Sequence, residues 1–160
     1  MKIRVLLAAL GFSLAFIACQ APTQRFTVRD VATVQSILDS VTADIRASKW
    51  ENLGKHFSDD AWFVAGNAVI GGQTAIVHWA KSLSQLESFS FGPAEVHGDA
   101  GLAYGWSPVY VKLKDLPADT ARQLIVFRRG SDRRWVIQAI SMNSDLPLPP
   151  SAHASGLSPR

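Results

Sequence analysis

The sequence predicts an α+β fold in which N-terminal helices cover a bent antiparallel sheet. In the first part of the chain, apolar residues recur at three- and four-residue steps, which is the helical period. From about residue 89 onward they alternate with polar residues, which is the strand period. The chain has 160 residues, of which 48% are hydrophobic and 18% are charged. These values suit one domain with a packed core.

Three segments carry the helical pattern. The first follows Asp30, the expected N-cap, and its apolar stripe consists of Val31, Val34, Ile37, Leu38, Val41 and Ile45. The second runs from residue 50 to 57, and a capping box between Ser48 and Glu51 is expected to open it. The third runs from Gln73 to about Leu83, with Ile76, Trp79, Ala80 and Leu83 on one face.

The strands form a short hairpin, at 61–65 and 68–70, and a longer C-terminal series. That series covers 89–91, 94–97, 100–114, 120–129 and 133–142. Pro108 lacks an N–H for the ladder, so we expect a bulge or an edge position there. A bulge would move the inward-facing set from Leu102, Tyr104 and Trp106 to Val109, Val111 and Leu113.

The N-terminus has the pattern of a secretory signal peptide, assigned to residues 1–18. Lys2 and Arg4 precede an uncharged run that is too short for a bilayer span. Cys19 follows Ala18 in a sequence that resembles the bacterial lipobox, although a cut after Ala21 is the alternative. We therefore expect export across a bacterial inner membrane and a periplasmic or envelope-facing domain, anchored in the membrane through lipidated Cys19. Residues 19–27 would be a tether, 28–147 the domain and 148–160 a disordered tail.

Composition excludes several function classes. Without Lys2 and Arg4, 14 basic side chains face 13 acidic ones, which gives no electrostatic basis for nucleic-acid binding. One cysteine and four scattered histidines make no metal site. The sequence has no P-loop and no dinucleotide fingerprint, so we expect no cofactor.

Residues 53–63, 68–76 and 135–147 form three segments that are similar to the nuclear-transport-factor-2-like superfamily. Residues 53–63 resemble its passage from a helix end into the first strand, and residues 68–76 its hairpin return and third helix. Residues 135–137, with 143–147 just beyond, look like the last strand of the SnoaL-like branch. The resemblance implies a cone-shaped, cystatin-like architecture, with a curved antiparallel sheet on three helices and an apolar pocket inside. Relatives use that pocket for isomerisation, cyclisation, dehydration or binding, so the fold does not choose the function.

The resemblance also allows one test for catalysis. Ketosteroid isomerases carry their aspartate base four residues beyond a segment similar to Asp59-Asp60-Ala61, and the count ends on Ala65, which cannot move a proton. The remaining acid–base candidates are Asp44, His97 and Asp145.

Aromatic residues on the predicted strands are candidates for a ligand pocket, because Tyr and Trp combine an apolar body with a polar tip. Two polar strand residues could add orienting groups if they point inward. The pocket candidates are Trp62, Tyr104, Trp106, Tyr110, Arg122 and Gln138. Ordinary core packing or a dimer face would explain the aromatic residues equally well.

Three hypotheses follow. The first is an exported module that binds a small, partly apolar molecule in the cone. The second is a metal-independent acid–base enzyme of the isomerase, cyclase or dehydratase type. The third is a homodimeric interaction module, which an exposed apolar strip at Val109, Val111, Ile125 and Phe127 would support.

Overall fold

The computed structural model describes residues 25–66, 68–83 and 85–143. Three helices are present there, α2 (Val28–Arg46), α3 (Trp50–Lys55) and α4 (Gln73–Ser82). A hairpin of β1 (Phe57–Ala65) and β2 (Ala68–Gly71) lies between α3 and α4 in the chain. The remaining strands are β3 (Leu86–Phe91), β4 (Glu95–Gly98), β5 (Leu102–Leu113), β6 (Asp119–Arg129) and β7 (Trp135–Asn143). The α+β class predicted from the sequence is confirmed.

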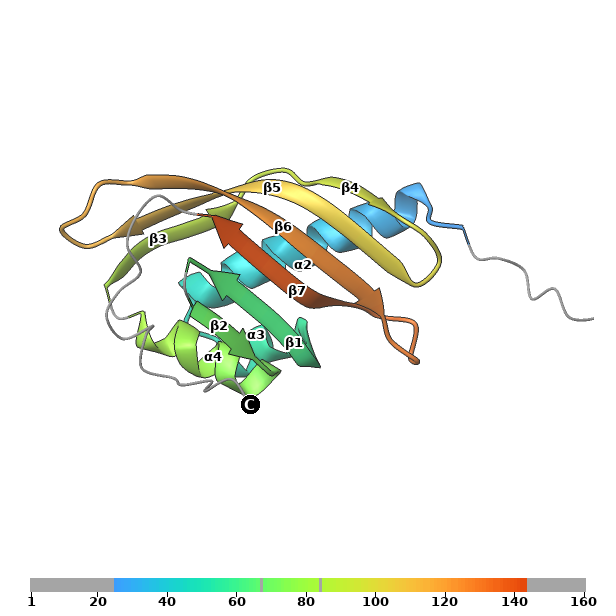
Figure 1. Ribbon diagram of the computed structural model, residues 1–160, viewed down its shortest axis with the longest axis horizontal. Coiled ribbons are helices and arrows are strands. Elements are labelled where there is room, and N and C mark those ends of the chain that lie inside the picture. Colours follow the sequence, from blue (N-terminus) through green and yellow to red (C-terminus); the bar gives the residue numbers. More distant parts are fainter. Residues whose placement is uncertain (1–24, 67, 84, 144–160) are drawn as a thin grey trace, which may run out of the picture.

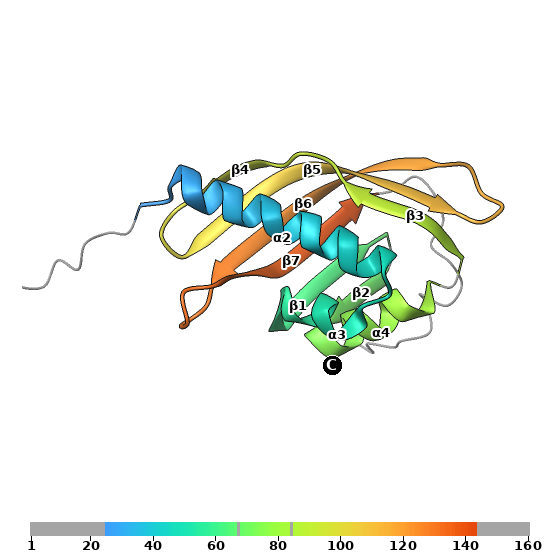
Figure 2. The ribbon, with the colours of Figure 1, turned by 180° about the vertical axis from the view of Figure 1, so that it is seen from behind.

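One curved, unclosed sheet contains all the described strands, in the order β2-β1-β7-β6-β5-β3, with β4 also paired to β5 (Figure 1). The sheet is mixed rather than purely antiparallel, because β1 pairs in parallel with β7. All three helices lie on one face, where α2 crosses the strands and α3 and α4 lie beside β1 and β2 (Figure 2). That face is concave and holds the core, whereas none of the described residues forms a helix on the other face (Figure 1).

Helix α2 begins one turn earlier than expected. Thr27 is its N-cap, and Asp30 completes a capping box from the third helical position. The buried side chains Val34, Leu38 and Val41 follow the predicted apolar stripe. The spacing of the apolar residues therefore predicted the buried face of the helix correctly, and only the capping residue was wrong.

The second predicted capping box does not form. Ser48 has a φ of 53° and precedes Lys49, the N-cap, which makes no side-chain cap hydrogen bond. Helix α3 ends at Lys55, and Phe57 already belongs to β1, where it pairs with Ile137 of β7. Strand β1 therefore starts four residues earlier than the predicted strand at 61–65, and Asp59 and Asp60 lie in the irregular stretch between its two paired segments, at Phe57 and from Trp62 onward.

Strand β5 keeps one inward parity from end to end, so of the two alternatives predicted for Pro108, a bulge or an edge position, the bulge and its change of parity are wrong. Its pairing with β6 runs without a register shift from Leu102 to Val111. Pro108 instead faces the interruption between β3 and β4, where its carbonyl oxygen accepts a hydrogen bond from the Gly92 amide at 2.8 Å. A missing amide is tolerated there because no partner strand requires it.

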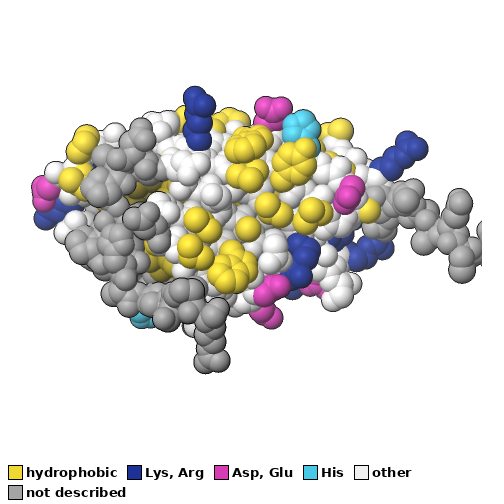
Figure 3. Space-filling view, in the orientation of Figure 1, with side chains coloured by type: hydrophobic (Ala, Val, Ile, Leu, Met, Phe, Trp, Pro, Cys, Tyr) yellow, Lys and Arg dark blue, Asp and Glu magenta, His cyan; other side chains and the backbone are white. Residues whose placement is uncertain are grey.

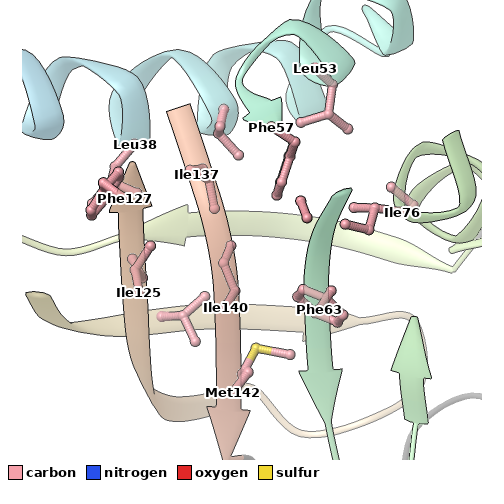
Figure 4. Close-up of a cluster of buried hydrophobic side chains, with 14 of the residues drawn as sticks. Leu38, Leu53, Phe57, Phe63, Ile76, Ile125, Phe127, Ile137, Ile140 and Met142 are labelled. Atoms are coloured by element: carbon pink, nitrogen blue, oxygen red, sulfur yellow. The ribbon is translucent and has the colours of Figure 1, made fainter. Parts of the chain in front are cut away.

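The core fills the space between α2 and the concave face. Figure 4 shows Leu38 of α2 close to Phe127 of β6, with Ile125 and Ile137 beside them, and these four side chains are fully buried. The edge strand β3 is also tied to α2. The Phe91 amide donates to Thr42 Oγ1, and Arg46 Nε donates to the Phe89 carbonyl. These contacts cover an edge that would otherwise present unpaired backbone groups.

Several predictions fall outside the described residues. These are the signal peptide at 1–18, lipidation of Cys19, most of the tether, the acid–base candidate Asp145 and the tail at 148–160. Within the described ranges, no helix has the length and apolarity needed to cross a membrane.

Candidate functional site

An apolar cavity of about 100 Å³ lies between the helices and the concave face of the sheet. Helices α2, α3 and α4 form one side, and strands β1, β3, β5, β6 and β7 form the other. Figure 4 labels six of the wall residues, which come from α3, α4, β1 and β7. The wall consists of Val41, Ile45, Leu53, Phe57, Phe63, Ile76, Trp79, Ala80, Leu83, Leu86, Phe89, Phe91, Val111, Leu113, Asp119, Gln123, Ile140 and Met142.

The predicted apolar face of the third helix contributes directly to this cavity. Ile76, Trp79, Ala80 and Leu83 all belong to the wall. The Trp79 ring packs against Phe63 of β1, with ring centroids 4.5 Å apart. Such aromatic contacts add to the free energy gained from burying the area itself. Helix α4 therefore forms part of the helical side of the cavity wall.

Few polar groups interrupt the wall. Asp119 is the only titratable side chain among the described wall residues. Gln123, on β6, is only 2% exposed, and its Nε2 donates to Ser107 Oγ of β5 at 2.9 Å. The Trp79 indole nitrogen is buried and has no hydrogen-bond partner in the described part of the chain. Burying a polar group without a hydrogen-bond partner costs free energy, so Gln123 and Trp79 are the wall residues that can indicate which ligand binds.

The four aromatic pocket candidates lie together on the opposite, convex face. Between 46% and 55% of each of Trp62, Tyr104, Trp106 and Tyr110 is exposed, and none of them lines the cavity. Trp62 and Tyr104 occupy one cross-strand row, separated by Ala139 and Val126. Figure 3, in the orientation of Figure 1, shows hydrophobic side chains gathered over this face of the sheet. The structure thus brings the four residues together, but away from the cavity.

The two polar pocket candidates also lie outside the cavity wall. Arg122 is exposed on β6 and pairs with Asn143 of β7 and Pro108 of β5. Gln138, on β7, is half-buried, and its side chain accepts a hydrogen bond from the Ser58 hydroxyl and donates to the Asp60 carbonyl. Gln138 therefore bridges β7 to the irregular start of β1.

The acid–base candidates do not converge. Asp44 of α2 accepts a hydrogen bond from His56 at 2.8 Å, in a surface groove that Ser40, Ala43, Asn52 and Lys55 complete. His97 of β4 lies 3.1 Å from Glu95, and both are largely exposed. Neither Asp44 nor His97 lines the cavity, and Ala65 is buried on β1. Among the described residues, no cluster of three or more His, Cys, Asp or Glu side chains could hold a metal ion.

Three arginines around the β6–β7 turn contact acidic residues. Arg129 contacts Asp30 at the start of α2, and its guanidinium lies 4.5 Å from the centre of the Trp135 ring. Burial alone would raise the pKa of Asp30. Hydrogen bonds from Trp135 and Thr27, together with the Arg129 charge, outweigh burial and lower that pKa to about 2. Arg128 pairs with Asp60 at 2.9 Å, and Arg134 pairs with Asp132.

Gln123 is the wall residue that the sequence interpretation passed over. A signal was present, because Gln123 shares its parity with Ala121, Ile125 and Phe127, all buried. A polar residue in phase with the apolar face of a strand points into the core. Arg122 and Gln138 drew attention as polar strand residues, but only strand register could show that neither is in that phase.

Solved structures provide the comparison with known proteins, because neither protein-family models nor curated proteins match the chain. A protein of unknown function with a cystatin-like fold, from Nostoc punctiforme, superposes with a TM-score of 0.68 at 16% identity, over 78% of this chain and 98% of that one.

Two further solved structures have the same arrangement. A ketosteroid isomerase-like protein from Erwinia carotovora atroseptica has a TM-score of 0.63 at 11% identity, over 76% of this chain and 100% of that one. The corresponding values for ActVI-ORFA from Streptomyces coelicolor are 0.57 and 13%, over 71% and 96%. These identities establish shared architecture rather than shared activity. With its curved sheet, three helices on one face and these structural neighbours, the chain has a cystatin-like fold, which is the architecture that the resemblance to the nuclear-transport-factor-2-like superfamily implied.

Proposed function

We propose that this protein binds a small apolar molecule, about the size of a single ring, in the cavity between α4 and the concave face. The observation that carries the proposal is a cavity of about 100 Å³ with an almost wholly apolar wall inside the buried core. Packed interiors rarely leave such a space, because unfilled volume costs stability. A ligand that fills it would recover the lost contacts.

The size of the cavity limits the ligand. An engineered apolar cavity of about 150 Å³ holds benzene, whereas sites for drug-sized ligands span about 300–1,000 Å³. The cavity is smaller than both, so its ligand is no larger than a single ring or a short alkyl chain, and a four-ring steroid does not fit. With Asp119 as the only titratable side chain among the described wall residues, the wall lacks an acid–base pair, which favours binding over proton transfer.

Titration calorimetry with toluene tests this function. We expect saturable binding with one site per chain. The variant Ala80→Phe should abolish binding, because Ala80 is buried at the wall and a phenyl ring there would occupy the cavity. Ala75→Phe, on the exposed side of the same helix, is the matched control and should bind as the parent does. Absence of binding for toluene and other single-ring hydrocarbons would contradict the function.

A second function, homodimerisation, is favoured by the convex face. The strip expected at Val109, Val111, Ile125 and Phe127 cannot provide it, because Val109, Ile125 and Phe127 are fully buried and Val111 is partly buried at the cavity wall. The exposed apolar side chains are those of the opposite parity. They comprise Trp62, Val69, Leu102, Tyr104, Trp106 and Tyr110. Exposed apolar side chains gathered on one face are typical of interaction sites.

Sedimentation velocity tests the dimer. The parent protein should sediment as a dimer, and Trp106→Glu should shift it to monomer, because a buried, unpaired carboxylate is costly at an interface. Val28→Glu places the same charge at an exposed site at the start of α2 and should leave the dimer intact. A parent protein that stays monomeric at high concentration would remove this function.

We further propose that the domain acts in the cell envelope, on a lipid anchor at Cys19. The basic start, the uncharged run and the lipobox-like Ala18-Cys19 junction support this placement. The intact mass of protein recovered from bacterial membranes should show a mature chain that starts at an acylated Cys19, and Cys19→Ser should release the protein from the membrane fraction. A mature chain that starts after Ala21 would contradict the anchor and leave export in place.

A further inference from the structure

We propose that the buried amide of Gln123 makes the cavity selective for a ring that carries a hydroxyl group, so that the preferred ligand is a phenol rather than a hydrocarbon. This inference rests on the proposed binding function and specifies its ligand class. It starts from the fact that Gln123 is a buried polar residue on an apolar wall, with its strand neighbours of the same parity, Ala121 and Ile125, also buried.

One half of the amide is already satisfied. Gln123 Nε2 donates to Ser107 Oγ at 2.9 Å, and Ser107 is itself only 4% exposed. The Ser107 hydroxyl donates its proton to the Pro108 carbonyl at 3.3 Å, so its oxygen remains free to accept from Gln123. This chain of hydrogen bonds fixes the orientation of the amide. An inverted amide would need Ser107 to donate twice, and a hydroxyl has one proton.

The other half of the amide is unpartnered. Among the described residues, no group donates to Gln123 Oε1, and this atom keeps some accessible surface, unlike the enclosed Trp79 indole nitrogen, while its residue lines the cavity. A carbonyl oxygen at an apolar wall loses free energy unless a donor reaches it. The atom that would complete this wall is therefore a hydrogen-bond donor on the ligand, and a phenolic hydroxyl supplies one with little added volume.

A second unpartnered group lies on the same wall and provides a contrast. The Trp79 indole N–H is buried without a partner in the described ranges, and it can only donate. A contact with Trp79 would favour ligands that accept, such as ethers, whereas a contact with Gln123 Oε1 favours ligands that donate. Acceptor-only and donor ligands thus distinguish the two residues.

The experiment compares two pairs of ligands by titration calorimetry on the full chain. Phenol and toluene are similar in size and differ in the hydroxyl, and anisole and ethylbenzene differ in an ether oxygen that only accepts. In a purely apolar cavity, toluene would bind more tightly than phenol, because the hydroxyl loses its water. We expect phenol to bind at least as tightly as toluene, and anisole to bind more weakly than ethylbenzene.

Substitutions test whether Gln123 causes the preference for phenol. Gln123→Leu, which is similar in volume, should weaken phenol binding at least tenfold and change toluene binding less than threefold. Ser107→Ala removes the group that orients the amide and should weaken phenol binding by a smaller factor. Ala75→Phe, on the exposed side of α4 and outside the wall, should leave the phenol and toluene affinities unchanged. If Gln123→Leu does not fold, as judged by its thermal melt, the parent protein's two ligand pairs and Ser107→Ala still decide the proposal.

Three outcomes would overturn the inference. Toluene binding tenfold tighter than phenol in the parent protein would show an apolar cavity without a polar selector. Anisole binding more tightly than ethylbenzene would assign the polar contact to Trp79. An unchanged phenol affinity in Gln123→Leu would remove the residue from recognition. In each case toluene still binds, so these results differ from failure of the proposed function, in which no single-ring ligand binds.

Discussion

Gly72 shows how one residue positions helix α4 against the cavity. It joins β2 to α4 with a φ of 90°, a conformation that L side chains rarely adopt, and its amide donates to the Ala61 carbonyl at 2.7 Å. The chain can therefore turn from the hairpin directly into the helix that carries Ile76, Trp79 and Ala80. A residue with a side chain would be strained here because of this φ angle, and not because its Cβ would clash with a neighbour.

We predict that Gly72→Ala lowers the free energy of unfolding by roughly 1–3 kcal/mol, the usual cost of a strained backbone conformation. Urea denaturation followed by circular dichroism measures the change. Gly101→Ala is the matched control, because a Cβ there meets nothing within 4 Å. That variant should be neutral or slightly stabilising, and equal effects at the two glycines would refute the explanation.

At the scale of elements, the start of α2 is fixed to the β6–β7 hairpin through Asp30. Its carboxylate accepts hydrogen bonds from Thr27, one turn before it, and from Trp135 Nε1 at 3.0 Å, and it contacts Arg129. Phe26 packs edge-on against Trp135, with ring centroids 5.7 Å apart. A residue first assigned to a helix cap thus also joins the helix to the sheet, across more than 100 residues of chain.

The pH dependence of stability should reveal this contact. The pKa of Asp30 is lowered from 3.8 to about 2 in the folded protein, so the carboxylate stabilises the fold above pH 4, by about 2 kcal/mol, and loses that contribution as the pH falls from 4 to 2. Asp30→Asn should therefore be less stable than the parent at pH 7 and lose less stability over that interval.

Urea denaturation at several pH values compares Asp30→Asn with Asp39→Asn, on the exposed side of the same helix. The control should keep the parent's pH dependence. Asp60, Asp99 and Asp132 also have lowered pKa values, so the Asp30→Asn curve should become shallower rather than flat. Parallel curves for the parent and Asp30→Asn would show that the contact contributes little.

For the whole molecule, the sheet separates two apolar surfaces. Its concave face borders the cavity. Its convex face presents hydrophobic side chains to the outside (Figure 3), and Trp62, Tyr104 and Trp106 are among the exposed ones. Alternation along each strand sends neighbouring residues to opposite faces. On β6, Gln123 faces the cavity while Arg122 is exposed.

This separation predicts that binding and dimerisation are independent. Trp106→Glu should change the dissociation constant for toluene less than twofold, because its side chain does not reach the cavity. Ala80→Phe should leave the sedimentation coefficient of the dimer unchanged. Calorimetry and sedimentation on both variants test the prediction, and loss of toluene binding in a folded, monomeric Trp106→Glu protein would show that the faces are coupled.

Hydrophobic period determined the class of this fold and the apolar stripes of α2 and α4 from the sequence alone, because those patterns are local. Which face of β5 turns inward was decided only in the tertiary structure. The sequence of β5 has apolar residues of both parities, Tyr104 and Trp106 in one and Val109 and Val111 in the other. The choice depends on pairing with β6 and on the helices that cover one side, and these contacts join residues distant in the chain. The cavity wall, drawn from eight elements, was undetermined by the sequence for the same reason.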